Sequence, residues 1–226
     1  MIFTYEQKLL NQVILHANDV PTRGLFSGQM GITLVLAEYA RLRKLHHLYT
    51  AIDFLLDEIL SNLLVSMSLC FTDGLTGIGW GVEYLIQKKL RKGSAIEVCE
   101  EIDHLLLQQN ILRISNLGLD TGFEGWLHYI IAHIQGGREN KKKVFDKYFL
   151  DDVHQKCLQL LNQDISPSLR ILCFTYINML NEGSAITYKF DLSTFVSSGI
   201  SKGEDRLGLH RGLSGLLFTA IKDELL

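Results

Sequence analysis

The chain has 226 residues, of which 47% are hydrophobic and 21% are charged, and it carries a formal net charge of −3. This length and composition suffice for a folded domain that needs neither disulfide bonds nor a metal to be stable. The slightly acidic balance provides no basic surface, so nucleic acid is excluded as an expected partner.

The sequence shows no sign of export or of membrane insertion. Its N-terminal residues lack the apolar core of an export signal, and its four cysteines have no paired spacing. A cytoplasmic protein with reduced thiols is therefore expected. The longest uncharged stretch, residues 59–72, has 14 residues, whereas a bilayer span needs about 20. No membrane span is expected.

A glycine element recurs along the chain, and an apolar run follows each copy. Its pairs of glycines three residues apart begin at Gly28, Gly74, Gly122 and Gly212, in steps of 46, 48 and 90 residues. Because 90 is about twice 45, a degenerate copy without glycines is expected near residues 166–169. The sequence thus predicts five repeat units, near residues 1–45, 46–92, 93–138, 139–183 and 184–226.

Helical periodicity fills the spaces between these elements. Three predicted helices carry apolar residues on one face only and are expected to lie outside, over residues 51–66, 94–106 and 144–161. Helices that are apolar nearly all round belong in an interior, and these are predicted over residues 32–40, 78–86 and 123–134. The degenerate copy leads into residues 171–180. Residues 182–205 are loop-like, so the last outer helix is expected to be short or missing.

The predicted fold is all-α, with each unit made of an outer helix, a loop and a glycine-led inner helix. No polar linker divides the chain, so one domain over residues 1–226 is expected. Two glycines three residues apart lie on one helix face and let a neighbouring backbone approach closely. The N-termini of the inner helices would then crowd around one mouth, and their unpaired N–H groups would suit an anion or polar backbone. Tight packing alone would also explain the glycines.

The glycine elements in register resemble those of the lanthionine synthetase C-like family. Residues 24–36 and 74–85 carry the likeness best, and it extends from about Gly24 to Leu217. The resemblance implies an α/α toroid of inner and outer helices, here a toroid-like array of about five helical hairpins. Enzymes of that family cyclise ribosomally made precursor peptides by adding cysteine thiols to dehydrated serines or threonines, and zinc activates the thiol. The sequence leaves open whether five units close a ring or form an incomplete one.

The zinc ligands of that family have no counterparts here. Its active enzymes place a cysteine two residues before one inner glycine and a Cys-His pair before the next. The matching positions in this chain are Phe26-Ser27, Thr72-Asp73, Asp120-Thr121 and His210-Arg211. His210 is the only candidate ligand in register, and one histidine cannot make a catalytic zinc site. No metal or other cofactor is therefore predicted, although Asp73, Asp120 and His210 could hold a harder metal if their units face each other.

Three functions follow as hypotheses, so the sequence leaves open whether the chain is an enzyme. The first is a cyclase-like enzyme acting on a ribosomal peptide, with His210, Asp120 and Asp73 as candidate catalytic residues. The second is a silent relative that binds a peptide or a partner modification enzyme in the same mouth. The absent zinc ligands favour this second hypothesis. An open ring would also expose apolar flanks and favour self-association.

The third hypothesis is a carbohydrate-active toroid that uses mouth carboxylates. Such an enzyme needs two facing carboxylates, and Asp73, Asp120 and Glu124 are the candidates. The proposed binding residues for either ligand class are Arg211, Glu124, Trp80, Trp126 and Glu83. Both aspartates also suit helix caps, and both tryptophans lie on inner helices and suit a core. His128 and His133 are interpreted as core or surface residues, because a spacing of five does not place them on one helix face.

Overall fold

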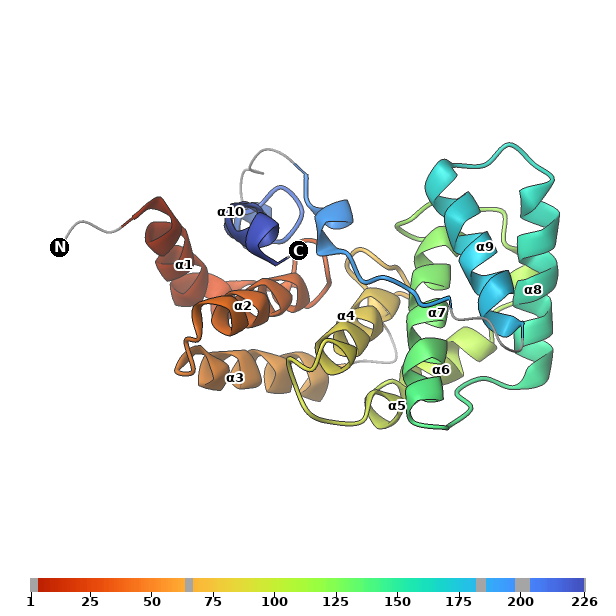
Figure 1. The fold of residues 1–226 in the computed structure, drawn as a ribbon, viewed down its shortest axis with the longest axis horizontal. Helices are drawn as coiled ribbons and strands as arrows, with labels where there is room; N and C mark the ends of the chain where they lie inside the picture. The colour runs from red at the N-terminus through yellow and green to blue at the C-terminus, as the bar shows by residue number, and fades with distance from the viewer. Residues whose placement is uncertain (1–3, 64–66, 182–185, 198–203, 226) are drawn as a thin grey trace.

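A computed structural model describes residues 4–63, 67–181, 186–197 and 204–225, and these residues form helices and loops without a strand (Figure 1). The predicted all-α class is confirmed. The α-helices are α1 (Tyr5–His16), α2 (Gln29–Arg43), α3 (Leu48–Ser61), α4 (Leu75–Gln87), α5 (Ala95–Val98), α6 (Glu100–Leu107), α7 (Phe123–Glu139), α8 (Lys147–Leu161), α9 (Pro167–Leu180) and α10 (Leu213–Ile221). None of the described helices is long and apolar enough to cross a membrane.

Five helices form a row in the order α10, α2, α4, α7 and α9, in which each packs against the next. The helices α1, α3, α6 and α8 lie against α10, α2, α4 and α9 respectively. The two ends of the row, α10 and α9, lie far apart (Figure 1). The C-terminal helix α10 thus joins the N-terminal end of the row, and the chain must cross the molecule to reach it.

The row helices begin where the glycine pattern predicts. Gly28, Gly74, Gly122 and Gly212 are the N-cap residues of α2, α4, α7 and α10. The degenerate copy begins α9, whose N-cap Ser166 accepts a hydrogen bond from the backbone N–H of Leu169. These four glycine-led helices are buried nearly all round over their first two turns, as their apolar composition requires.

The outer helices differ in detail from the sequence expectation. The helix predicted over residues 94–106 is divided at Cys99 into α5 and α6. In the predicted loop region 182–205, the described residues hold the short 3-10 turn Leu192–Phe195 and the start of another, Glu204–Leu207. Residues 182–185 and 198–203 lie outside the described part. No outer helix is present in the part of this region that the structure describes.

A segment over residues 186–196, extended as far as Asp191 and followed by the 3-10 turn Leu192–Phe195, crosses from the α9 end of the row toward α10 (Figure 1). We call it the strap. Over residues 188–192 burial alternates: Tyr188, Phe190 and Leu192 are buried, whereas Lys189 and Asp191 are exposed. Period-two alternation is the pattern of an extended chain that presents one face to an apolar surface. Here that surface is made by α4 and α7.

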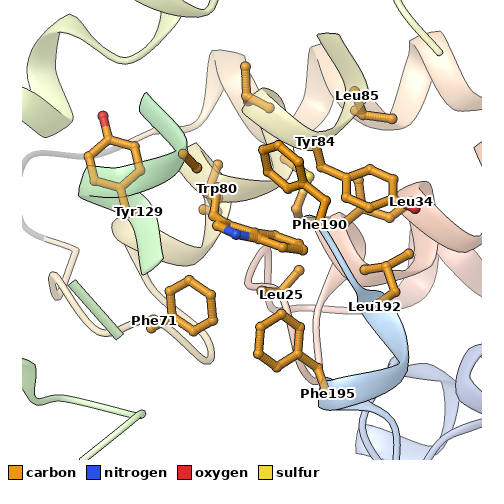
Figure 2. Packing of buried hydrophobic residues seen from close by; sticks show 14 of the residues in the cluster. Leu25, Leu34, Phe71, Trp80, Tyr84, Leu85, Tyr129, Phe190, Leu192 and Phe195 are labelled. Atoms are coloured by element: carbon orange, nitrogen blue, oxygen red, sulfur yellow. The ribbon is translucent and has the colours of Figure 1, made fainter. Parts of the chain in front are cut away.

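The strap completes an aromatic cluster on the row helices (Figure 2). Phe190 lies 5.3 Å and Phe195 lies 5.2 Å from Trp80, measured between ring centroids. Phe195 also packs edge-on against Phe71, at 5.4 Å. These rings are all buried. Each buried aromatic side chain contributes on the order of 2 kcal/mol through burial of apolar surface, so the strap is an integral part of the core.

The two ends of the described chain are tied together by one arginine. Arg43, at the end of α2, binds Glu6 of α1 with Nε–Oε1 at 3.0 Å and Glu224 near the C-terminus with Nη1–Oε2 at 2.7 Å. The two glutamates hold the pKa of the Arg43 guanidinium above its ordinary value. At the opposite end of the row, α8 and α9 expose the large apolar residues Tyr148, Leu158, Ile171 and Phe174.

Candidate functional site

The glycine elements fold into four similar loops, residues 22–31, 68–77, 116–125 and 206–215, which we call the glycine loops. In each, a backbone N–H of the first helical turn donates to the carbonyl seven residues earlier. The pairs are Gln29 to Thr22 (3.0 Å), Leu75 to Ser68 (2.9 Å), Phe123 to Asn116 (3.0 Å) and Gly215 to Gly208 (3.3 Å). The expectation that unpaired N–H groups line the mouth is therefore wrong, because each loop provides acceptors for N–H groups of its own helix.

The same closure explains the second glycine of each pair. A Cβ atom on Gly31, Gly77, Gly125 or Gly215 would overlap the carbonyl oxygen of the residue six positions earlier in its own loop. The close backbone approach expected from the sequence is present. The backbone that approaches belongs to the loop of the same unit, and side chains of the adjacent unit also come close: a Cβ on Gly31 would lie 2.8 Å from Leu209 Cβ, and one on Gly125 would lie 2.5 Å from Phe71 Cβ.

Backbone hydrogen bonds join the glycine loops into one row. His210 N–H donates to Phe26 O (2.9 Å), and Phe26 N–H donates to Thr72 O (2.7 Å). Phe71 N–H then donates to Asp120 O (2.6 Å). The four positions that match the zinc-ligand register of the resembling family thus lie consecutively, in the order 210, 26, 72 and 120.

The two candidate catalytic aspartates serve as ties between adjacent loops. Asp73 Oδ1 accepts the backbone N–H of Ser27 at 2.9 Å. Asp120 Oδ1 accepts the hydroxyl of Thr72. Each carboxylate therefore has a structural partner in the next unit, and such a bond to a charged acceptor contributes about 1.5–3 kcal/mol where it is shielded from water.

His210 and Arg211 occupy the last glycine loop. His210 donates from Nδ1 to the carbonyl of Phe195 (2.9 Å), and its ring stacks on Phe26 with centroids 5.1 Å apart. It thereby anchors the end of the strap to the loop row. Arg211 is exposed and has a left-handed backbone, with φ of 54°.

The residues of the loop row do not fit a zinc site. Among the eight matching positions, only His210 carries a nitrogen or sulfur ligand of the kind that catalytic zinc uses. The described residues contain no group of three or more histidine, cysteine or acidic side chains arranged to hold a metal ion. Cys70, which is close by, accepts the N–H of Asp73 at 3.4 Å, and burial raises the pKa of its thiol.

The two tryptophans are buried, so neither offers a face for stacking on a sugar. Trp80 is completely covered, and Trp126 is 9% exposed. Their indole N–H groups also have internal acceptors: Trp80 donates to the Tyr188 hydroxyl (2.9 Å) and Trp126 to the Leu69 carbonyl (2.9 Å). The ligand-binding role expected for both residues is corrected, because burial and hydrogen bonding make them part of the core.

Glu124 is likewise buried within the row. It lies in the first turn of α7, and its carboxylate accepts hydrogen bonds from the hydroxyls of Ser166 (3.2 Å) and Ser168. Both serines belong to the start of α9. Glu124 therefore joins the third glycine loop to the degenerate fourth unit, in the place where the other loops use backbone bonds.

Glu83 belongs to a buried polar network between α4, α6 and α7. His133 Nδ1 lies 2.5 Å from Glu83 Oε1, and its Nε2 lies 2.8 Å from Asp103 Oδ2. Tyr129 donates to the other oxygen of Asp103 (2.6 Å), and Gln87 donates to Glu83 (2.5 Å). Burial disfavours the charged imidazolium, but the two carboxylates raise the pKa of His133 to about 9. At neutral pH the centre is a doubly paired imidazolium in which His133 and Glu83 are fully buried and the Asp103 side chain is 11% exposed.

A second polar chain joins the strap to the row. The indole of Trp80 donates to the hydroxyl of Tyr188, which lies 2.6 Å from Nδ1 of His128. The His128 ring stacks on Phe71 at 5.3 Å. Burial among these rings lowers the pKa of His128 to about 3, so the imidazole is neutral. Of these two histidines, which the sequence analysis interprets as core or surface residues, His133 lies in the core and His128 lines a pocket.

That pocket, which we call the strap pocket, lies between the strap and α9 and has a volume of about 350 Å³. Ile171 and Leu172 of α9, Tyr188 of the strap and His128 of α7 form much of its lining. The sequence analysis missed it, because its walls come from the segment interpreted as loop-like and from the unit without glycines. The alternation of buried residues 188, 190 and 192 was the available signal.

Comparison of the chain with protein-family models, with curated protein sequences and with solved structures gives no match.

Proposed function

We propose that this chain is a non-catalytic relative of the lanthionine synthetase C-like proteins, and that it binds an extended apolar peptide segment in the strap pocket. In this proposal the row of helices is an open form of that family's toroid. In this proposal the chain holds the peptide and does not change it chemically. The observation that carries the proposal is an apolar pocket beside a segment that the protein already holds in an extended form.

The strap supports the proposal because it is itself an extended peptide bound to the row. Tyr188 donates its backbone N–H to Oε1 of Gln135 (2.6 Å) and accepts from Nε2 of the same side chain (3.2 Å). Alternate side chains of the strap fill apolar positions on α4 and α7. Backbone recognition with pockets for alternate side chains is the general way in which proteins bind extended peptides.

The exposed apolar side chains at the α9 end provide the surface for this segment. Ile171 is 65% exposed and lines the strap pocket, and Phe174 on the same helix is 50% exposed. The exposed surface of the strap pocket is mostly apolar, although hydroxyl and charged side chains also line it, and a pocket of a few hundred Å³ accommodates one residue of a peptide. The rim carries one cation and one anion, Lys189 and Asp191, so a neutral segment fits it best.

The alternatives of the sequence analysis receive less support. The positions for zinc ligands hold phenylalanine, threonine, aspartate and histidine, and Asp73 and Asp120 are engaged between loops. A carbohydrate-active site needs carboxylates free to act and open aromatic faces. Both tryptophans are in the core.

Selection from a random octapeptide library on the immobilised protein tests the proposal. Wild type is compared with Ile171→Glu, which places a charge in the pocket, and with Phe174→Glu, a matched change on the same helix outside the pocket lining. Both native side chains are largely exposed, so both variants should fold. We expect wild type and Phe174→Glu to enrich apolar peptides, and Ile171→Glu to lose them. Retention of oligosaccharides, or no enrichment, would overturn the proposal.

A further inference from the structure

The chain of hydrogen bonds that ends at His128 decides which of its ring nitrogens carries the proton. The Trp80 indole can only donate, so the Tyr188 hydroxyl oxygen is the acceptor in that bond. Among the described residues the Tyr188 hydroxyl has no acceptor other than Nδ1 of His128, 2.6 Å away, so its own proton is assigned to that bond. A neutral imidazole that accepts at Nδ1 carries its proton on Nε2.

The Nε2–H group of His128 has no hydrogen-bond partner within the described residues, and the ring forms part of the strap pocket. Most hydroxyl groups around the pocket already donate a hydrogen bond to an acceptor within the protein. Ser168 donates to Glu124, Thr175 to the carbonyl of Ile171 (2.9 Å) and Thr194 to the carbonyl of Asp191 (2.7 Å). His128 therefore supplies a fixed donor in a largely apolar wall.

We infer that the strap pocket recognises an aliphatic residue of an extended peptide together with a backbone carbonyl next to it, and that this carbonyl accepts from Nε2–H of His128. This inference rests on the proposed function and identifies the backbone carbonyl of the peptide as the polar group that the pocket recognises. A neutral carbonyl suits the site, because Lys189 and Asp191 on the rim carry opposite charges. The Trp80–Tyr188 pair acts through His128 and positions it.

The probe for this inference is N-acetyl-leucine N-methylamide, a blocked aliphatic residue with two backbone carbonyls. It is titrated into protein labelled with ¹⁵N at histidine, and long-range ¹H–¹⁵N spectra report the protonated nitrogen of each ring. We expect His128 to be protonated at Nε2 and bare at Nδ1 in the free protein. The Nε2–H resonance should shift saturably when the probe binds. A proton on Nδ1, or no saturable shift, would overturn the inference.

Substitution separates this inference from the proposed function. His128→Phe keeps an aromatic ring on Phe71 and removes the donor, so it should weaken probe binding about fivefold, the loss of one hydrogen bond. Tyr84→Phe is the control, because it removes a buried hydroxyl bond to Glu38 that lies away from the pocket. A second probe has both carbonyl oxygens replaced by sulfur, which is a weaker hydrogen-bond acceptor. It should bind wild type more weakly than the amide probe does, whereas His128→Phe should bind the two probes with nearly equal affinity.

The outcomes differ for the two claims. If Ile171→Glu loses peptide capture while His128→Phe binds the probe as tightly as wild type, the proposed function stands and the carbonyl contact is wrong. If neither peptides nor the probe bind wild type, both are wrong. Equal weakening by Tyr84→Phe and His128→Phe would mean that the effect is a general loss of packing, which also contradicts the carbonyl contact.

Discussion

The buried centre formed by Glu83, Asp103 and His133 makes the stability of the fold depend on pH. The two carboxylates hold His133 as an imidazolium, and its pKa rises from 6.5 to about 9. The perturbation that tests this is the triple substitution Glu83→Gln, Asp103→Asn and His133→Gln. It keeps the approximate shapes and hydrogen-bonding groups but leaves nothing in the centre that titrates near neutral pH.

The magnitude follows from linkage between protonation and folding. A pKa raised in the folded state means that the folded protein binds the proton more tightly. The stabilisation is therefore complete below pH 6.5 and is lost as the pH rises through about 9. One pKa unit corresponds to about 1.4 kcal/mol, so the full effect is about 3 kcal/mol, of which about 2 kcal/mol disappears between about pH 6 and pH 8.

His128 acts in the opposite direction over the same range. Its pKa falls to about 3 because burial excludes the imidazolium, so stability rises as the unfolded-state histidine loses its proton near pH 6.5. This gain is about 0.8 kcal/mol between about pH 6 and pH 8. Both the wild type and the triple variant contain His128, so its contribution cancels in their difference.

The assay is urea unfolding, followed by far-ultraviolet circular dichroism, at about pH 6 and pH 8. We expect the free energy of unfolding of wild type to fall by about 2 kcal/mol more than that of the triple variant over this interval. The variant His104→Gln, on the same outer helix as Asp103, is the control and should behave as wild type. A difference between wild type and triple variant that does not change with pH would refute the account of the centre.

Three further predictions concern the loops, the strap and the metal content. Gly77→Ala should destabilise the protein by about 1–3 kcal/mol in urea unfolding, because the added Cβ would overlap the Phe71 carbonyl. Gly118→Ala is the control and should lower the free energy of unfolding by less than half as much, because its added Cβ meets only a side-chain oxygen at 3.3 Å. Phe195→Ala should cost about 3–5 kcal/mol and increase binding of a hydrophobic dye, because it removes the ring that seals the strap against Trp80; an unchanged midpoint would contradict this. Protein purified without a histidine tag should contain no stoichiometric zinc by elemental analysis, and about one zinc per chain would contradict the conclusion that the loop row does not fit a zinc site.

The sequence predicted the row helices well, because their signal is local. The glycine pairs mark where each helix begins, and the apolar residues that follow have no polar face to offer solvent. Gly28, Gly74, Gly122 and Gly212 are N-caps in the structure, and the period also located α9, which has no glycine. The reason for the glycines was only partly accessible, since loop closure onto the same helix depends on backbone geometry that the pattern does not contain.

The candidate site was harder to predict because it depends on contacts between distant segments. Asp73 and Asp120 were recognised as acids near helix starts, but their partners Ser27 and Thr72 lie 46 and 48 residues away. The alternation at residues 188, 190 and 192 indicates an extended segment with one buried face, but it does not say which helices that face covers, so the position of the strap over α4 and α7 could not be predicted. The role proposed for His128 depends on its contact with Tyr188, which lies 60 residues later in the sequence.

The central claim is that this chain holds an apolar peptide segment in the strap pocket. The most direct measurement is the affinity, by isothermal titration calorimetry, of the octapeptide most enriched on wild type for wild type, Ile171→Glu and Phe174→Glu. A charge that must be desolvated in the pocket should weaken binding at least tenfold in Ile171→Glu, and Phe174→Glu should remain within twofold of wild type. Equal affinities for wild type and Ile171→Glu would contradict the claim.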